Sequence, residues 1–211
     1  ATQEAIELTQ RAQKIGADGA LLITPYYNKP TQEGLYQHFS AVAKETDLPI
    51  ILYNVPSRTS INMVSNTVAR LSSVRNIVGI KEASGSLVQV SEILDSCGPD
   101  FEVISGEDAL TWPILAIGGK GTISVTANLV PDKCAKMCRA AREGDVDKAK
   151  ELHYELLKLN DILFIETNPI PVKAALALMG LIQNEFRPPL CALTEEHLSQ
   201  LKAVLETYEL L

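Results

Sequence analysis

A lysine and a tyrosine stand at the ends of two short apolar runs, where side chains able to do chemistry are grouped. Residues 50–55 carry Tyr53 near their end, and residues 77–80 lead directly into Lys81. Burial disfavours the charged form of a lysine and lowers its pKa, which makes the amine a better nucleophile. A neutral amine can form a Schiff base with a ketone, and a nearby phenol can transfer the protons. From the pattern alone, Lys81 is equally a lysine that reaches from a strand end to solvent, and Tyr53 a core residue.

The composition of the chain narrows the class of protein. The 211 residues carry a net charge of −7, which argues against a nucleic-acid-binding surface or attachment to an anionic membrane. The apolar run 174–182 is too short to span a bilayer, which takes about 20 residues. The first residues have neither the basic nor the apolar region of a signal peptide. We therefore expect an ordinary soluble enzyme of the cytoplasm.

The cysteines and histidines do not form a metal-binding pattern. Cys134 and Cys138 share a predicted helix face, but no Cys-x-x-Cys pair or neighbouring histidine accompanies them. Small buried thiols in a reducing compartment explain the cysteines better than a metal site does. The three histidines are scattered on predicted helices, so no metal is expected.

Along the first 125 residues, short apolar runs alternate with segments whose apolar residues are spaced as on one face of a helix. The pattern predicts strands at residues 20–24, 50–55, 77–81, 101–105 and 121–125. The run 20–24 reads as a strand buried on both faces. A helix is predicted before the first strand, at 2–15, and another after every strand, including one capped by Thr31 with the apolar face Leu35, Phe39 and Val42. Strands that alternate with helices indicate βα units and a parallel sheet.

Polar residues and glycines mark where the predicted helices begin and end. Thr2, Thr31, Ser86 and Asp108 are candidate N-caps, and Gly16 suits the position after a helix. The helix from 63 to 71 carries an aligned apolar face. Beyond residue 130 only helices are predicted, at 131–142, 146–165, 172–181 and 195–208.

Five sequence motifs resemble those of the pyruvate-dependent class I aldolase family, in its dihydrodipicolinate synthase branch. They are TPYYNKP at 24–30, YNVPSRT at 53–59, GIKEASG at 79–85, ISGED at 104–108 and GTISVTAN at 121–128. The motifs follow the order of the family and span most of the chain. The resemblance implies a TIM (β/α)₈ barrel, here truncated to five βα units over residues 1–130. Residues 131–211 would hold the last barrel helix and a C-terminal helical extension.

A closed barrel takes eight strands and about 250 residues, so the resemblance implies that roughly the first 80 residues and three strands are absent. A glycine- and threonine-rich loop of the family, which takes part in binding pyruvate and in the proton relay, would lie there. We therefore expect the missing strands to come from a second polypeptide or to have been removed, because an unclosed barrel leaves sheet edges exposed.

The resemblance also assigns roles to residues of the reaction centre. Lys81 would form the Schiff base with pyruvate, and Tyr53 would give and take protons. Tyr27 would enter a neighbouring subunit's site and complete the relay there. Arg58 would receive the carboxylate of L-aspartate 4-semialdehyde, which suits a planar guanidinium. No metal or organic cofactor would be needed.

Four further residues match family positions outside the reacting groups. Gly106 and Ile123 would line the pyruvate pocket, although they could equally be a turn glycine and an ordinary strand residue. Glu4 and Tyr26 fall on two positions of a site where lysine acts as a feedback inhibitor. An exposed carboxylate favouring a helix N-terminus is the alternative interpretation of Glu4. The family implies a homotetramer built as a dimer of dimers.

The resemblance implies a lyase that condenses pyruvate with L-aspartate 4-semialdehyde on the route to diaminopimelate and lysine. One alternative is another pyruvate-dependent aldolase, of the 2-keto-3-deoxy sugar acid or N-acetylneuraminate lyase type. The sequence after the Tyr-x-x-Pro turn, which includes Arg58, distinguishes the chain from the latter. The other alternative is an inactive fragment of the barrel with a structural role.

Overall fold

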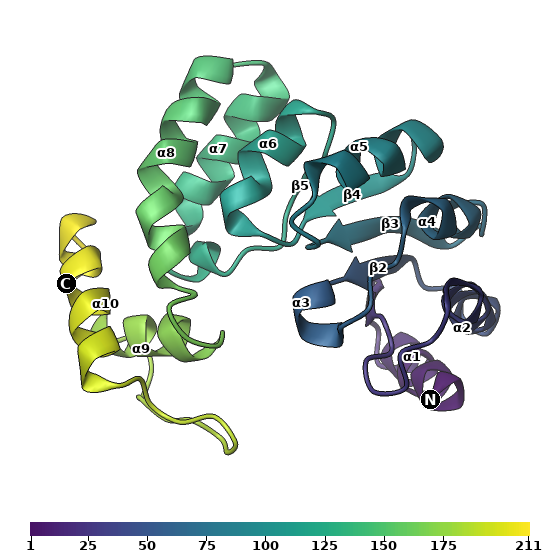
Figure 1. Cartoon of the computed structure of the whole chain (residues 1–211), viewed down its shortest axis with the longest axis horizontal. Coiled ribbons are helices and arrows are strands. Elements are labelled where there is room, and N and C mark those ends of the chain that lie inside the picture. The colour runs from purple at the N-terminus through teal and green to yellow at the C-terminus, as the bar shows by residue number, and fades with distance from the viewer. The chain divides into compact units, whose positions relative to one another are not determined.

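The computed structural model describes residues 1–211, which divide into two compact units, Ala1–Ile123 and Ser124–Leu211 (Figure 1). The first unit is built on a five-stranded sheet of order β1-β2-β3-β4-β5, in which every neighbouring pair is parallel. The strands are β1 (Ala20–Ile23), β2 (Ile50–Asn54), β3 (Ile77–Glu82), β4 (Glu102–Ser105) and β5 (Gly121–Thr122). This confirms the predicted α/β class and parallel sheet.

Helices precede, separate and follow these strands. The first unit contains α1 (Thr2–Lys14), α2 (Gln32–Lys44), α3 (Pro56–Thr59), α4 (Ser65–Ser72), α5 (Leu87–Ser96), η1 (Asp108–Leu110) and α6 (Thr111–Ala116). The second contains η2 (Thr126–Asn128), α7 (Pro131–Glu143), α8 (Val146–Ile162), α9 (Ile170–Leu178) and α10 (Glu195–Thr207). None of them combines the length and apolar character that a membrane crossing requires.

One face of the sheet carries the hydrophobic core of the first unit. Apolar side chains of α2, α4 and α5 pack there against the central strands, and many of them are completely buried. The predicted apolar face of α2 is confirmed, since Leu35, Phe39 and Val42 are all 0% exposed. Burial of apolar surface contributes about 25 cal/mol per Å², so this layer stabilises the unit.

The opposite face of the sheet is only partly covered. Leu21 and Ile23 of β1 are 45% and 40% exposed, and Ile123, just after β5, is 40% exposed. The prediction that residues 20–24 form a strand buried on both faces is therefore wrong. A continuous apolar run indicates two apolar faces, but helices cover only one of them in this structure.

The caps of the helices agree with the sequence in part. Thr31 and Ser86 cap α2 and α5 by accepting the backbone N–H groups of residues 34 and 89, and Gly16 has φ +89° after α1, all as predicted. Thr2 is instead the first residue of α1, and its hydroxyl lies 2.9 Å from Nδ1 of His38. Asp108 lies inside η1, with Glu107 in the cap position.

The strands and helices also differ in length from the predictions. The fifth strand has two residues rather than the five of 121–125, because the chain turns into η2 soon afterwards. Met63 and Val64 precede α4, and Val64 is 39% exposed rather than part of an apolar face. In the second unit, α8 ends at Ile162 rather than at residue 165.

Within the second unit, α7 and α8 form a hairpin joined by a tight turn. Gly144 has φ +79°, and the side chain of Asp145 accepts the N–H of Lys148 to cap α8. The hydroxyl of Tyr208, at the end of α10, donates to the carbonyl of Glu155 and accepts the N–H of Leu159. These bonds attach α10 to α8.

Candidate active site

The register of the sheet places Tyr53 opposite Lys81 at the carboxyl ends of β2 and β3. Ile50 pairs with Ile77, but the next pair is Ile51 with Gly79, so the register shifts by one residue. Without that shift Tyr53 would pair with residue 80. Because side chains alternate between the two faces of a strand, the irregularity decides that Tyr53 and Lys81 share a face.

The two side chains are in contact. Lys81 Nζ lies 4.2 Å from the centroid of the Tyr53 ring. Both residues are half-buried on the partly covered face of the sheet. An amine over a phenol ring is held by the attraction between its cationic form and the ring face, and it is screened from water on that side. The structure therefore brings together the two residues on which the predicted chemistry depends.

Burial acts on the two groups in opposite directions. Removal from water lowers the pKa of Lys81, while the negative charge of Asp108 partly opposes this and raises that pKa. Burial also raises the pKa of Tyr53, and the positive charge of Arg58 partly lowers it. Burial thus shifts both groups toward their neutral forms, and a neutral amine beside a protonated phenol is the pairing that nucleophilic attack followed by proton transfer requires.

Gly106 and Ile123 lie beside this pair, at the ends of the next two strands. The N–H of Gly106 donates to the carbonyl of Glu82 over 2.8 Å, and that of Ile123 donates to the carbonyl of Ser105 over 2.9 Å. A Cβ atom on Gly106 would lie 3.0 Å from Cε and 3.1 Å from Cγ of Lys81. The glycine therefore leaves room for the lysine chain.

Arg58 belongs to the short helix α3, which starts at Pro56 directly after β2. Its side chain is exposed, and its positive charge partly offsets the rise that burial causes in the pKa of Tyr53. Ser60, with φ +56°, ends α3 in the left-handed conformation and returns the chain toward α4. Arg58 is thus an exposed cation close to the Lys81–Tyr53 pair.

The remaining predicted residues are not brought into this cluster. Tyr27, in the loop after β1, is 93% exposed, and Tyr26 is 64% exposed. Glu4, at the start of α1, is exposed and forms an ion pair over 3.4 Å with the amino group of Ala1. The assignment of Glu4 and Tyr26 to a lysine-binding site stays a prediction. So does the assignment of Tyr27 to the site of a neighbouring subunit.

Two functional features were missed by sequence reasoning. Asp108 was expected only to cap a helix, whereas its charge acts on Lys81. The buried polar pair of Asn54 and Glu82, one residue after Tyr53 and Lys81, was not singled out. Strand alternation could have identified the pair. It places the side chains of Asn54 and Glu82 on the same face as the buried apolar residues of β2 and β3.

Comparison with known proteins agrees with the geometry. Residues 1–208 match a model of the dihydrodipicolinate synthetase family. The chain belongs to this family. It is 58% identical over 205 residues to 4-hydroxy-tetrahydrodipicolinate synthase of Nitratidesulfovibrio vulgaris strain DP4, an alignment that covers 97% of this chain and 70% of the relative.

Solved structures of the dihydrodipicolinate synthetase family have the same fold. Dihydrodipicolinate synthase from Aquifex aeolicus superposes with a TM-score of 0.97 at 49% identity, covering 100% of this chain and 72% of that one. The chloride-inhibited enzyme from Acinetobacter baumannii, complexed with pyruvate, also reaches a TM-score of 0.97, at 46% identity over 100% of this chain and 72% of that one. This chain is thus shorter than these relatives.

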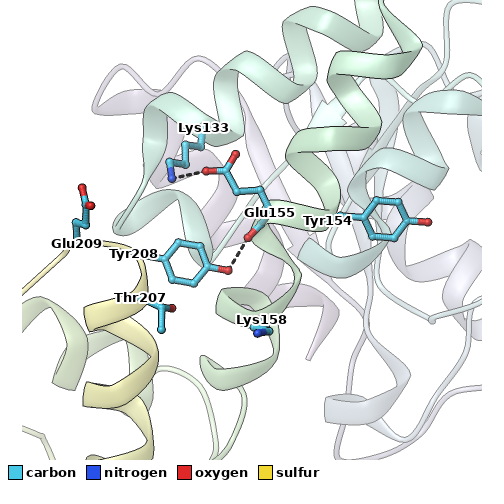
Figure 2. A pocket seen from close by; sticks show the side chains of 7 residues that line it. All are labelled: Lys133, Tyr154, Glu155, Lys158, Thr207, Tyr208 and Glu209. Carbon is cyan, nitrogen blue, oxygen red and sulfur yellow. Dashed lines mark hydrogen bonds and ion pairs between the residues drawn. The ribbon is translucent and has the colours of Figure 1, made fainter.

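A separate cavity of about 390 Å³ lies in the second unit, between α7, α8 and the end of α10 (Figure 2). Two of its charged groups, Lys133 and Glu155, pair with each other. Lys133 forms an ion pair with Glu155 over 2.5 Å and lies 5.6 Å from the centroid of the Tyr208 ring. In Figure 2 the Tyr208 hydroxyl points at the backbone of Glu155. We interpret this cavity as a gap in the packing of these three helices rather than as a reaction centre.

Proposed function

We propose that this chain carries the reaction centre of a 4-hydroxy-tetrahydrodipicolinate synthase, which condenses pyruvate with L-aspartate 4-semialdehyde in lysine biosynthesis. The observation that carries the proposal is the half-buried amine of Lys81, held 4.2 Å from the Tyr53 ring at the carboxyl end of a parallel sheet. Reaction centres of parallel barrels lie at that end of their strands. The family and its named relatives supply the substrate class.

The proposed reaction begins with the neutral amine of Lys81. Its nitrogen attacks the keto carbon of pyruvate, and loss of water leaves an imine. Loss of a proton from the methyl group then gives an enamine, whose carbon attacks the aldehyde. Attack by the amino group of the second substrate closes the ring and releases Lys81. The protonated imine accepts the electron pair in this sequence, so we propose that no metal or organic cofactor takes part.

Tyr53 and Arg58 have distinct proposed roles. The raised pKa of Tyr53 keeps its phenol protonated, so that it can donate to the oxygen that leaves as water. The guanidinium of Arg58 is proposed to bind the carboxylate of the semialdehyde. Tyr27, at 93% exposure, is proposed to complete the proton relay in a neighbouring subunit of a homotetramer. A cytoplasmic location belongs to the same proposal.

We also propose that the sheet is an arc of a (β/α)₈ barrel. Its strands follow one another in sequence order, whereas a doubly wound sheet reverses order at a switch point. Each helix connects a strand to the next strand along the sheet, always in the same direction. Because such crossovers have the same hand, their helices all lie on one face of the sheet. The hydrophobic core accordingly lies on one face here. The other, partly exposed apolar face would then line the barrel, with further strands supplied by polypeptide outside residues 1–211.

Reductive trapping tests the proposed reaction. Incubation with pyruvate and borohydride is expected to add one reduced pyruvate to Lys81, as located by peptide mass spectrometry. Lys81→Met should remove the adduct, whereas Lys120→Met, which changes an exposed lysine before β5, should retain it. Absence of an adduct from the folded wild-type chain would refute the proposal. Turnover with L-aspartate 4-semialdehyde against sugar-acid-derived aldehydes would then define the second substrate.

A further inference from the structure

A buried polar pair follows Tyr53 and Lys81 directly in the sequence. Asn54 and Glu82 pair with each other in the register of β2 and β3, and they are 0% and 1% exposed. Alternation along the strands turns their side chains to the face opposite Tyr53 and Lys81. Burying a carboxylate is costly unless hydrogen bonds replace its water. A buried glutamate beside the reactive lysine therefore requires an explanation.

The carboxylate of Glu82 is held entirely by N–H donors. One oxygen accepts the backbone N–H of Ser84 over 2.6 Å. The other accepts from the side-chain amides of Asn54 over 3.0 Å and Gln89 over 3.3 Å. Three donors from three segments meet at one carboxylate, so Glu82 connects the end of β2, the loop after β3 and the first turn of α5.

The network continues from Asn54 to the segment that follows Arg58. Asn54 Oδ1 accepts the N–H of Met63 over 2.9 Å, and its Nδ2 also donates to Asn62 Oδ1 over 2.8 Å. Asn62 Nδ2 in turn donates to Gln89 Oε1 over 2.7 Å. The chain between β2 and α4, which includes α3, is thus fixed at both ends to the same buried amides.

We propose that Glu82 and Asn54 are positioning residues, which lock the ends of β2 and β3 together and so hold Lys81 and Tyr53 in contact. Neither side chain touches the reacting face. Just beyond the paired residues, the N–H of Ala83 donates to the carbonyl of Asn54 over 2.9 Å. The buried side chains of Glu82 and Asn54 also bind α5 and the chain between β2 and α4, which the backbone bonds of the sheet do not reach. The catalytic meaning of this inference depends on the proposed function.

Exchange of the two side-chain types across the pair gives a sharp test. In Glu82→Gln, the new NH₂ group faces an N–H donor whichever way the amide is turned, either that of Ser84 or those of Asn54 and Gln89. In Asn54→Asp, the new carboxylate faces that of Glu82. The double variant N54D/E82Q again sets a donor opposite an acceptor. We expect each single substitution to slow trapping of pyruvate on Lys81 about tenfold, the scale of a small misplacement, and the double variant to recover part of the rate.

A matched control separates positioning from loss of stability. Asn76, 9% exposed at the other end of β3, donates to three backbone carbonyls within residues 43–48. Asn76→Ala should lower the melting temperature without changing the rate of trapping below it. If Glu82→Gln melts below the assay temperature, Gln89→Ala, which removes one donor from the carboxylate, takes its place with a smaller expected effect.

A second readout keeps the inference independent of pyruvate chemistry. The rate at which acetic anhydride acetylates Lys81, relative to exposed lysines of the same chain, reports its placement over Tyr53 whether or not pyruvate is bound. Failure of the wild type to trap pyruvate would count against the proposed function, while altered acetylation in Glu82→Gln would still support positioning. A folded Glu82→Gln variant with wild-type acetylation, or single variants that the double substitution does not rescue, would overturn the inference.

Discussion

Lys81 and Tyr53 show how one partly buried environment can shift the pKa values of an amine and a phenol in opposite directions. Burial destabilises the charged form of each group, so it lowers the pKa of the ammonium and raises that of the phenol. The nearby charges of Asp108 and Arg58 oppose these shifts. Because desolvation is the larger cause in both cases, the pKa of Lys81 is lowered and that of Tyr53 is raised overall. The protonation of each group therefore depends on the balance between desolvation and the charge of one neighbouring residue.

Asp108 gives a prediction about pH. Its negative charge raises the pKa of Lys81, so Asp108→Asn should lower that pKa further. A lower pKa increases the fraction of neutral amine at every pH below it. The acid limb of the trapping rate against pH is therefore expected to move to lower pH. Asp95→Asn, on the exposed surface of α5, should leave the profile in place, and an alkaline shift in Asp108→Asn would contradict the assignment.

Gly106 gives a prediction about space. A methyl group there would lie 2.8 Å from Cβ of Ala83 and about as close to the chain of Lys81, so Gly106→Ala should displace the lysine. We expect the trapping rate to fall at least tenfold, since misplacement of about 1 Å costs up to 100-fold. Gly98→Ala is the control, because its Cβ would meet nothing within 4 Å. Equal trapping by the two variants would refute the role of Gly106.

At the scale of the secondary-structure elements, the irregularity between β2 and β3 is the decisive feature. It shifts the register between Ile50 and Ile51, so that Tyr53 faces Lys81. Gly79 is the first β3 residue in the new register, and it lies against β4 with no space for a side chain. A glycine inside a strand often marks a bulge or a close approach of two backbones, and here it coincides with both.

Gly79→Ala should therefore disturb the sheet itself. The added Cβ would lie 2.5 Å from the carbonyl oxygen of Glu102, and a backbone atom cannot move away as a flexible side chain can. We expect a loss of about 1–3 kcal/mol in the free energy of unfolding, measured by urea denaturation. Gly121→Ala on β5, which meets nothing within 4 Å, should change stability much less. Equal losses would show that the contact at Gly79 is relieved without strain.

The sequence predicted the elements better than their surroundings. Alternating strands and helices, the caps at Thr31 and Ser86 and the place of Lys81 at a strand end follow from local patterns, and the structure has them. The exposure of Ile23 and the shifted register depend on which other segments pack nearby, so no local pattern contains them. The influence of Asp108 on Lys81 is likewise a contact between separate strand ends.

For the whole molecule, the central question is what covers the second face of the sheet. In a soluble domain an apolar strand face is expected to be buried, yet Leu21 and Ile23 remain nearly half exposed. The longer relatives contain residues without a counterpart here, since this chain spans 70% of the N. vulgaris relative. The barrel proposed above accounts for both observations if those residues supply the remaining strands.

Two leucines on opposite faces of neighbouring strands provide the test. Leu52 is 0% exposed, so Leu52→Ala should cost about 2–5 kcal/mol of unfolding free energy in the 211-residue chain. Leu21 is 45% exposed, and Leu21→Ala should cost under about 1 kcal/mol there, because it removes little buried surface. Addition of a polypeptide with the relative's unmatched residues should raise the cost of Leu21→Ala toward that of Leu52→Ala, as measured by urea denaturation. If the cost at Leu21 does not change although the added polypeptide binds, the partly covered face is not the interior of a barrel.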